Sequence, residues 1–223
     1  MFKVAKLDIN RNPFIGLYLA ASENAVIYSN FLQERTISTI VDTLKPKITC
    51  VTSIGSSYLT GLFSVLNSNG IVVPKFTEDQ EISRIKKELG INVYKLDDRF
   101  SAVRNNLLAN DNACIVNKKI SKTDQMRIRD CLGVEVFPTK TKLPTVGSIN
   151  VVTNKGLLGY NDATDEELNW LSSTLKVNAV RGTCNFGTTA TSLGIAANSN
   201  GAIVGAMSTG FELGTVHQAL SGE

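Results

Sequence analysis

The sequence predicts an α/β protein in which five β-hairpin-plus-helix repeats close into a five-fold pseudosymmetric ring. Two sets of positions with the same spacing support this prediction. Small residues at predicted turns are separated by 45, 43, 43 and 45 residues, and a leucine follows each of them after 19 residues. Such a period is typical of propellers, solenoids and closed arrays. The turn positions are Ala25, Gly70, Ala113, Gly156 and Gly201; the leucines are Leu44, Leu89, Leu132, Leu175 and Leu220.

Each repeat contains a predicted β-hairpin around its turn position. Apolar residues stand five before and two after the turn position, and a small polar residue stands three before it. This order of apolar, polar and apolar segments is typical of strand, turn and strand. The pairs Asn69-Gly70 and Asn200-Gly201 are expected to supply positive φ angles in two of the turns. The polar residues are Ser22, Asn67, Asn110, Thr153 and Asn198.

A short helix is predicted to end each repeat. An aliphatic residue stands four before each leucine, which places both on one helical face. The segment from Thr164 to Glu167 matches a capping box, and Thr77 precedes another acidic first turn. Each apolar stripe covers only one side, so we expect a neighbouring sheet to cover it. The aliphatic residues are Ile40, Ile85, Ile128, Leu171 and Val216.

The repeats are expected at about residues 3–47, 48–90, 91–133, 134–176 and 177–220 of one domain spanning 1–223. A repeat of this length buries too little surface to fold alone. Closing five of them into a ring removes the exposed sheet edges. A WD40-type propeller is disfavoured because its blades have four strands and no helix. An open helical solenoid is disfavoured because the strand pattern is as regular as the helix pattern.

Composition indicates a soluble, cytoplasmic protein. The chain is 43% hydrophobic, lacks an 18-residue apolar run, and begins with MFKVAKLDIN, which has no signal-peptide core. No membrane association is therefore expected. The cysteines show no CxxC or zinc-ligand spacing, so we expect reduced structural thiols and no metal site. They are Cys50, Cys114, Cys131 and Cys184.

The positive charge is concentrated in the middle of the chain. Residues 84–142 hold 13 of the 23 Lys and Arg residues against 7 acidic ones. One interpretation is a general nucleic-acid binder that contacts phosphates. The other is solvated helix faces, because Lys86, Lys87, Arg127 and Arg129 fall on polar sides of predicted helices. Aromatic residues make up 7% of the chain and do not alternate with the basic residues, so a base-stacking surface is not indicated.

A catalytic alternative is a guanidine-modifying enzyme, which also uses a ring of five α/β units with a nucleophilic Cys and a His. The single histidine, His217, follows every cysteine, whereas those enzymes place it well before the Cys. Cys184 has only Arg181 as a nearby basic residue, so activation of its thiol is unsupported. No nucleotide-phosphate motif is present. The residues therefore predict a binding protein with no cofactor, not an enzyme.

Several short motifs occur in order along the chain, from Asn12 to Glu212. They are Ile54-Gly55-Ser56-Ser57 with Gly61, Pro144 to Ser148, Val152 to Gly156, Gly182-Thr183 with Gly187-Thr188-Thr189, and Ser208-Thr209-Gly210 with Glu212-Leu213. Together they resemble the archaeal and eukaryotic translation initiation factor 6 family of ribosome anti-association factors. The absence of a long tail after Glu223 resembles the archaeal branch. Two residues depart from the family pattern: Phe186 stands where Lys or Arg is usual, and Phe211 where Pro is common.

The resemblance implies a pentein-type β/α propeller and a function without chemistry. The family implies binding to the joining face of the large ribosomal subunit, chiefly through a ribosomal protein near the sarcin–ricin loop. Occupying that face would sterically keep the small subunit away. We expect the chain to act as a monomer in this way, and in subunit maturation, without reading a nucleic-acid sequence directly.

The candidate contact residues come from the repeat register together with the resemblance. The positions nine before the turns are expected to start one strand in each repeat and to form a ring of loops on one face. These positions are Gly16, Gly61, Arg104, Gly147 and Ser192. By resemblance, Asn105, which follows Ser101 to Arg104, contacts the subunit, and Leu62, Ser148 and Ile149 occupy comparable places. For the glycines, tight packing of the ring is an equal alternative.

Overall fold

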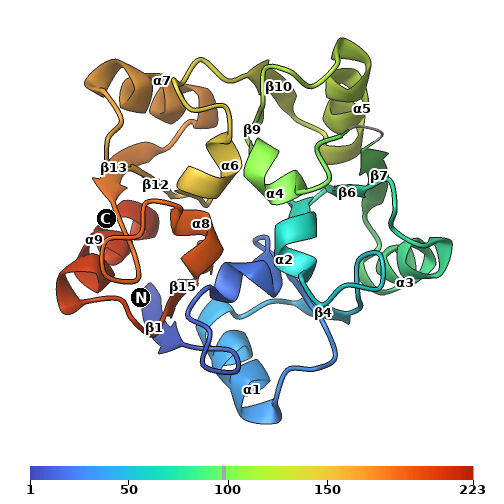
Figure 1. Ribbon diagram of the computed structural model, residues 1–223, viewed down its shortest axis with the longest axis horizontal. Helices are drawn as coiled ribbons and strands as arrows, with labels where there is room; N and C mark the ends of the chain where they lie inside the picture. The colour runs from blue at the N-terminus through green and yellow to red at the C-terminus, as the bar shows by residue number, and fades with distance from the viewer. Residues whose placement is uncertain (97–98, 223) are drawn as a thin grey trace.

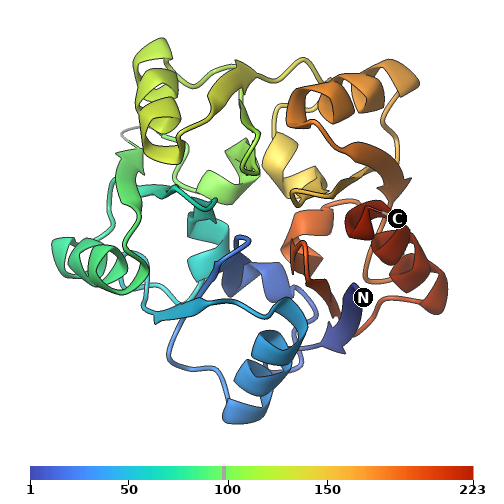
Figure 2. The ribbon, with the colours of Figure 1, turned by 180° about the vertical axis from the view of Figure 1, so that it is seen from behind.

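The computed structural model describes residues 1–96 and 99–222. It confirms the predicted α/β ring: five three-stranded sheets surround a central axis, and a long helix lies outside each (Figure 1). Figure 2 shows the same arrangement from behind, where the strands are nearer the viewer. No helix among the described residues is long and apolar enough to cross a bilayer.

The predicted hairpins form the inner and middle strands of each sheet. Each turn position is the first residue of a middle strand. The inner strands line the axis: β2 (Leu19–Ala21), β5 (Val65–Leu66), β8 (Leu107–Ala109), β11 (Val151–Val152) and β14 (Ile195–Asn198). The middle strands are β3 (Ala25–Tyr28), β6 (Gly70–Pro74), β9 (Ala113–Val116), β12 (Gly156–Tyr160) and β15 (Gly201–Gly205), each antiparallel to its inner strand.

A third, outer strand completes each sheet and was not predicted. In four sheets it follows the long helix and pairs in parallel with the middle strand of the preceding hairpin. In the fifth sheet it comes from the N-terminal segment and pairs with the last hairpin. Each sheet therefore combines a hairpin from one expected repeat with an outer strand from another. The outer strands are β4 (Ile48–Val51), β7 (Asn92–Leu96), β10 (Glu135–Pro138), β13 (Asn178–Gly182) and β1 (Lys3–Leu7).

The predicted long helices are present, and the leucine at the end of each apolar stripe is buried. Each helix packs against the sheet of the preceding repeat, as its one-sided stripe requires: α3, for example, contacts β4. Thr164 forms the predicted capping box with Glu167, whereas α3 is capped by Glu78 and not by Thr77. The helices are α1 (Glu34–Leu44), α3 (Asp79–Leu89), α5 (Lys122–Leu132), α7 (Asp165–Leu175) and α9 (Gly210–Ser221).

The ring is closed by strands from opposite ends of the sequence. β1 pairs in parallel with β15, from Lys3 opposite Gly201 to Leu7 opposite Gly205. The two chain ends consequently lie on the same sector of the ring (Figure 1). The hydrophobic clusters are shared between neighbouring repeats in the same way: Val72 of β6 belongs to one cluster with Cys114 of β9.

The polar residues three before the turns join one repeat to the next. The side-chain amide of Asn110 donates to the carbonyl oxygens of Thr153 (3.1 Å) and Leu175 (3.0 Å). Asn67 makes the equivalent bonds to Asn110 and Leu132, and Asn198 to Ser22 and Leu44. Thr153 reaches only Leu220, at 3.4 Å. The bonds to Leu132, Leu175 and Leu44 help to satisfy carbonyl oxygens at helix ends, which also accept from Asn69, Asn112 and Asn200.

The glycines at the turn positions allow close packing. The positive φ angles expected there are absent. Asn69, Gly70, Asn200 and Gly201 are not among the residues with positive φ. A Cβ atom at Gly70 would lie 2.2 Å from the carbonyl oxygen of Cys131 in α5. Only glycine therefore fits where this hairpin packs against the helix of the next repeat.

Candidate functional site

The most distinctive surface is the face that carries five short helices around the axis, here called the helix-ring face. The short helices are η1 (Ile15–Leu17), α2 (Thr60–Phe63), α4 (Val103–Asn106), α6 (Val146–Ile149) and α8 (Thr191–Gly194). They were not predicted: the positions nine before the turns lie in these helices and do not start strands. The expected ring on one face is nevertheless present (Figure 1).

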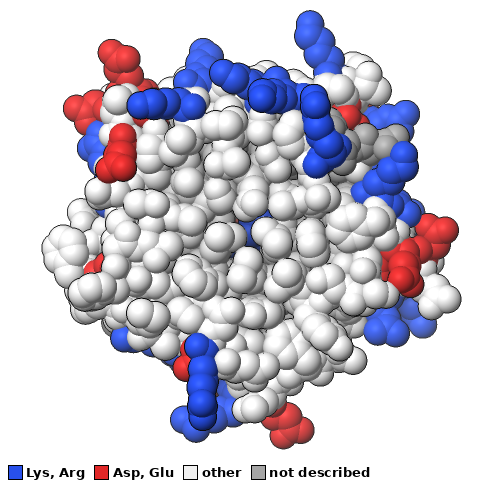
Figure 3. All heavy atoms as spheres, in the orientation of Figure 1, with Lys and Arg blue, Asp and Glu red and all other residues white. Residues whose placement is uncertain are grey.

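The helix-ring face is almost free of charge over its centre. In Figure 3, which views this face, Lys, Arg, Asp and Glu atoms gather at the rim, and only a small group of basic atoms appears near the axis. Charged residues are depleted from the cores of protein interfaces, and a charged rim is typical. The face therefore suits docking of a protein surface better than binding to a phosphate backbone, which requires basic side chains.

Glycines let the short helices approach each other around the axis. A Cβ atom at Gly16 would lie 2.0 Å from the carbonyl oxygen of Ser192, and one at Gly61 would lie 2.2 Å from that of Gly16. A Cβ atom at Gly147 would lie 2.0 Å from the carbonyl oxygen of Arg104. Real Cβ contacts are never this short, so these glycines are required by the packing of neighbouring backbones.

The loops that lead into the short helices are held by carboxylates at the starts of the long helices. Glu212 of α9 accepts hydrogen bonds from the backbone N–H groups of Phe186 (3.1 Å) and Gly187 (2.8 Å) and from the hydroxyl of Thr183 (2.9 Å). Glu81 of α3 holds the loop at Gly55 and Ser56 in the same way. The outline of the helix-ring face is thereby fixed by buried polar contacts.

These contacts shift the carboxyl pKa values. Burial alone would raise the pKa of Glu212, but the hydrogen bonds from Thr209, Gly187 and Thr183 stabilise the ionised form, and the net pKa lies below its usual value. The pKa of Glu81 is lowered for the same reasons, with Ser53 the first of its donors. A folded-state pKa below the unfolded one stabilises the protein above the unfolded pKa, and this stabilisation is lost as pH falls through the folded pKa.

We therefore expect Glu212→Gln to lower the free energy of unfolding by about 2 kcal/mol at pH 7, because charged hydrogen bonds are replaced by weaker ones. The difference from the natural protein should shrink below about pH 4, where the carboxyl of the unfolded chain is protonated. Urea unfolding at pH 7 and pH 3.5 measures both values. Glu166→Gln, at an exposed carboxylate in the first turn of α7, is the matched control and should change stability little at either pH. A loss that is equal at both pH values would contradict the role given to ionised Glu212.

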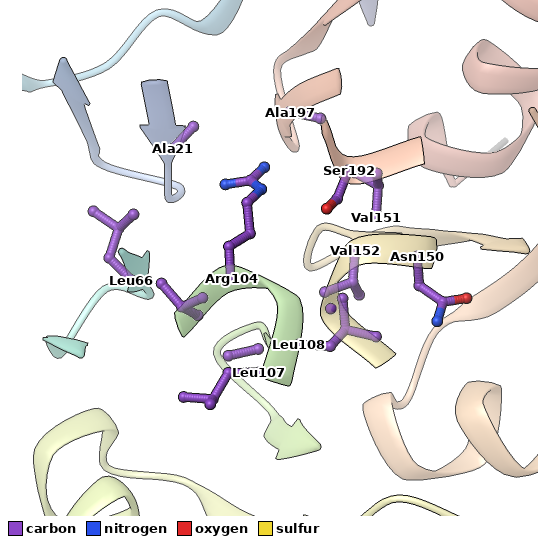
Figure 4. Close-up of a pocket in the computed structure, with 13 residues that line it drawn as sticks. Ala21, Leu66, Arg104, Leu107, Leu108, Asn150, Val151, Val152, Ser192 and Ala197 are labelled. Carbon is purple, nitrogen blue, oxygen red and sulfur yellow. The ribbon is translucent and has the colours of Figure 1, made fainter. Parts of the chain in front are cut away.

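The predicted contact residues divide into half-exposed and buried groups. Leu62 of α2 and Asn105 of α4 are half-buried and occupy equivalent positions of their helices. Gly16, Gly61, Ser148 and Ile149 are buried, and the hydroxyl of Ser148 donates to the carbonyl oxygen of Thr145 at 2.9 Å. Arg104 extends into a cavity on the axis and not across the outer surface (Figure 4).

Exposed aromatic residues on two loops and at the start of α9 were not among the predicted contacts. Tyr58, just before α2, is 58% exposed and packs at 5.3 Å from Phe31, which contacts Tyr18. Phe186, just before α8, is 78% exposed, and Phe211 at the start of α9 is 85% exposed. Large exposed aromatic side chains are typical of protein interfaces. The sequence signal that could have identified Phe186 and Phe211 is their departure from the family pattern.

The structure does not unite the residues that a cysteine enzyme would need. The four cysteines are free and buried. Burial raises the pKa of the Cys184 thiol to about 12, and the nearby Glu212 carboxylate adds to the rise, so the nucleophilic thiolate is disfavoured. His217 instead packs edge-on against Phe2 with ring centroids 5.6 Å apart. In the part of the chain that is described, no group of His, Cys, Asp or Glu side chains could hold a metal ion.

Four basic residues of the middle segment lie on solvated helix faces, which agrees with the second of the two interpretations. Lys86, Lys87, Arg127 and Arg129 are exposed on α3 and α5. Figure 3 places basic atoms along the rim next to these helices, away from the centre of the helix-ring face.

Comparison with known proteins agrees with this arrangement. The sequence model of the eIF-6 family matches residues 4–219. The chain is 38% identical to translation initiation factor 6 of Pyrococcus horikoshii, with 97% of this chain and 98% of the relative covered. It is 38% identical to the factor of the same name from Methanocaldococcus jannaschii, with 93% of each chain covered. It is 34% identical to that of Thermoplasma acidophilum, over 98% of this chain and the whole relative.

Proposed function

The chain belongs to the eIF-6 family of translation initiation factors, and from this premise we propose that it binds the large ribosomal subunit and sterically prevents joining of the small subunit. The observation that carries this proposal is the broad uncharged helix-ring face, with exposed aromatic residues on fixed loops. Such a face can bury a conventional interface of about 800 Å² per partner, and blocking then follows mass action.

The partner proposed for this face is a ribosomal protein near the sarcin–ricin loop of the large subunit. Leu62 and Asn105 are the proposed contact residues, because they are half-exposed on neighbouring short helices. The buried residues Gly16, Gly61, Ser148 and Ile149 are proposed to shape the face from beneath. The protein would act as a monomer in the cytoplasm, without a cofactor, and would also take part in maturation of the large subunit.

Sedimentation with purified ribosomal subunits tests the proposal. The protein is expected to co-migrate with the large subunit only, and fewer joined ribosomes should form as it is added. The double variant Leu62→Glu with Asn105→Asp should weaken co-migration at least about tenfold, because two charges would be desolvated at the interface. Its thermal transition should stay close to that of the natural protein.

The matched control is Asn169→Asp with Ser173→Glu, which adds the same charge on the exposed side of α7. It should leave co-migration unchanged. Equal pelleting with both subunits would contradict the proposal. A steep loss of binding with salt, shared by unrelated RNA, would instead indicate the general nucleic-acid binder.

The guanidine-modifying enzyme is not favoured. Replacing Cys184 and His217 by alanine should leave subunit binding nearly unchanged, whereas an enzyme would lose all turnover. The relatives are named as initiation factors, and the thiol environment of Cys184 opposes activation.

A further inference from the structure

A small cavity lies on the ring axis. Its volume is about 60 Å³, and it is lined by apolar residues of the inner strands together with the polar residues Arg104, Asn150 and Ser192 (Figure 4). Five residues at equivalent positions of the repeats separate this cavity from a second one of about 20 Å³ and line both of them. These residues are Ala21, Leu66, Ala109, Val152 and Ala197.

Arg104 is the one charged residue that lines the cavity of 60 Å³. The same position of the other repeats holds glycine or serine, so this guanidinium breaks the five-fold pattern. In Figure 4 it extends from α4 across the axis toward the opposite wall. One terminal nitrogen donates to the carbonyl oxygen of Ile195 at 3.2 Å, whereas Nε is buried without a hydrogen-bond partner.

A second polar group without a partner faces the same space. The hydroxyl oxygen of Ser192 on α8 is buried and makes no hydrogen bond among the described residues, and Ser192 lines the cavity. Arg104 also forms no ion pair with a described carboxylate. Buried polar groups are nearly always satisfied, and a buried charge normally has a partner of opposite sign. Both groups can donate a hydrogen bond to one acceptor in the cavity, and the charge of the guanidinium favours an acceptor that is negative.

The guanidinium of Arg104 stays positively charged at neutral pH. Burial lowers the pKa of Arg104 to about 10, so the guanidinium is still protonated there. Glu23 and Asp111 line the second cavity, and their carboxylates are already engaged: Glu23 accepts from Ser199, and Asp111 accepts from Ser68.

We propose that the axial cavity binds a small monovalent inorganic anion such as chloride, between the guanidinium of Arg104 and the hydroxyl of Ser192. The size follows from the volume, which equals about two waters. The single charge follows from the lone guanidinium, the one charged group that lines the cavity. The anion would neutralise this half-buried cation and stabilise the ring. This site is independent of ribosome binding and can be tested on the isolated protein.

Thermal unfolding in potassium chloride and in potassium gluconate of equal ionic strength tests the site, because gluconate is too large for it. An anion that binds only the folded ring at ten times its Kd should raise Tm by about 3–6 °C. The shift should vanish in Arg104→Met and persist in Arg127→Met, a matched loss of an exposed arginine on α5. Equal Tm values of the natural protein in the two salts, or the same shift in Arg104→Met, would overturn the proposal.

Chloride-35 NMR provides a second, independent measurement. The natural protein should broaden the chloride resonance, and excess bromide should reverse the broadening by competition. Ser192→Ala should keep the fold and weaken the chloride-dependent Tm shift by severalfold. If the natural protein broadens the chloride resonance equally with and without excess bromide, the cavity holds no exchanging anion.

Discussion

Gly147→Ala is expected to lower the free energy of unfolding by about 3–5 kcal/mol, which corresponds to a Tm about 10 °C lower. The added Cβ atom would lie 2.0 Å from the carbonyl oxygen of Arg104 and 2.2 Å from that of Leu107. Both are backbone atoms, so no rotamer change can relieve the clash. The helices α4 and α6 would have to separate, and with them the ring of short helices. Urea and thermal unfolding measure the effect.

Gly214→Ala is the matched control. Gly214 lies in the exposed part of α9, and a Cβ atom added there would have no other atom within 4 Å. This substitution should stabilise the protein by about 0.5–1 kcal/mol, because alanine favours a helix interior. If Gly147→Ala unfolds at the same urea concentration as the natural protein, close backbone packing is not what requires glycine at that position.

Asn110→Ala is expected to lower the free energy of unfolding by about 3 kcal/mol. The side chain is 4% exposed and makes four hydrogen bonds. Its amide joins the third repeat to carbonyl oxygens of Thr153 and Leu175, and its oxygen accepts from the backbone N–H groups of Asn112 and Ala113 at 3.0 Å. Alanine would leave the carbonyl oxygen of Thr153 and the two N–H groups buried without these bonds, at the cost of their desolvation, whereas the carbonyl oxygen of Leu175 keeps its bond from Asn112.

A graded series separates these bonds. Asn110→Thr copies the residue of the fourth repeat and should lose about half as much stability, because a hydroxyl supplies one donor where the amide supplies two. Asn112→Ala removes a single bond to Leu175 at 3.2 Å and should cost less than about 1 kcal/mol. Equal losses for Asn110→Ala and Asn112→Ala would show that the junction between repeats does not depend on Asn110.

The sequence was sufficient for the hairpins and long helices because each repeat places the same residue types in the same packing role. Leu132 and Leu175, for example, are both fully buried at helix ends. The short helices were missed because segments of three or four residues are too short to show helical periodicity. The outer strands were missed because they are half-exposed and so lack a continuous apolar pattern: Glu135–Pro138, for example, has no fully buried residue.

The candidate site was less predictable than the fold. Register alone placed Gly16, Gly61 and Gly147 together around the axis, but it could not show that backbone contacts bury them. The position of Arg104 as the one charged member of its register was visible in the sequence. Its direction was not, because a long side chain can extend inward or outward from the same helix. The aromatic loops also depend on carboxylates that are about 25 residues away in sequence, such as Glu212 for Phe186 and Gly187.

The pairing of β1 with β15 has a consequence for how the protein is made. During synthesis, residues 3–7 leave the ribosome long before residues 201–205, their partners in the sheet. Four sheets can assemble on the growing chain, since their strands are near neighbours in sequence, but the fifth has to wait. Until then the first strand keeps an unpaired edge and Phe2 lacks its packing partner His217. Closure is thus a late event that follows the emergence of nearly the entire polypeptide.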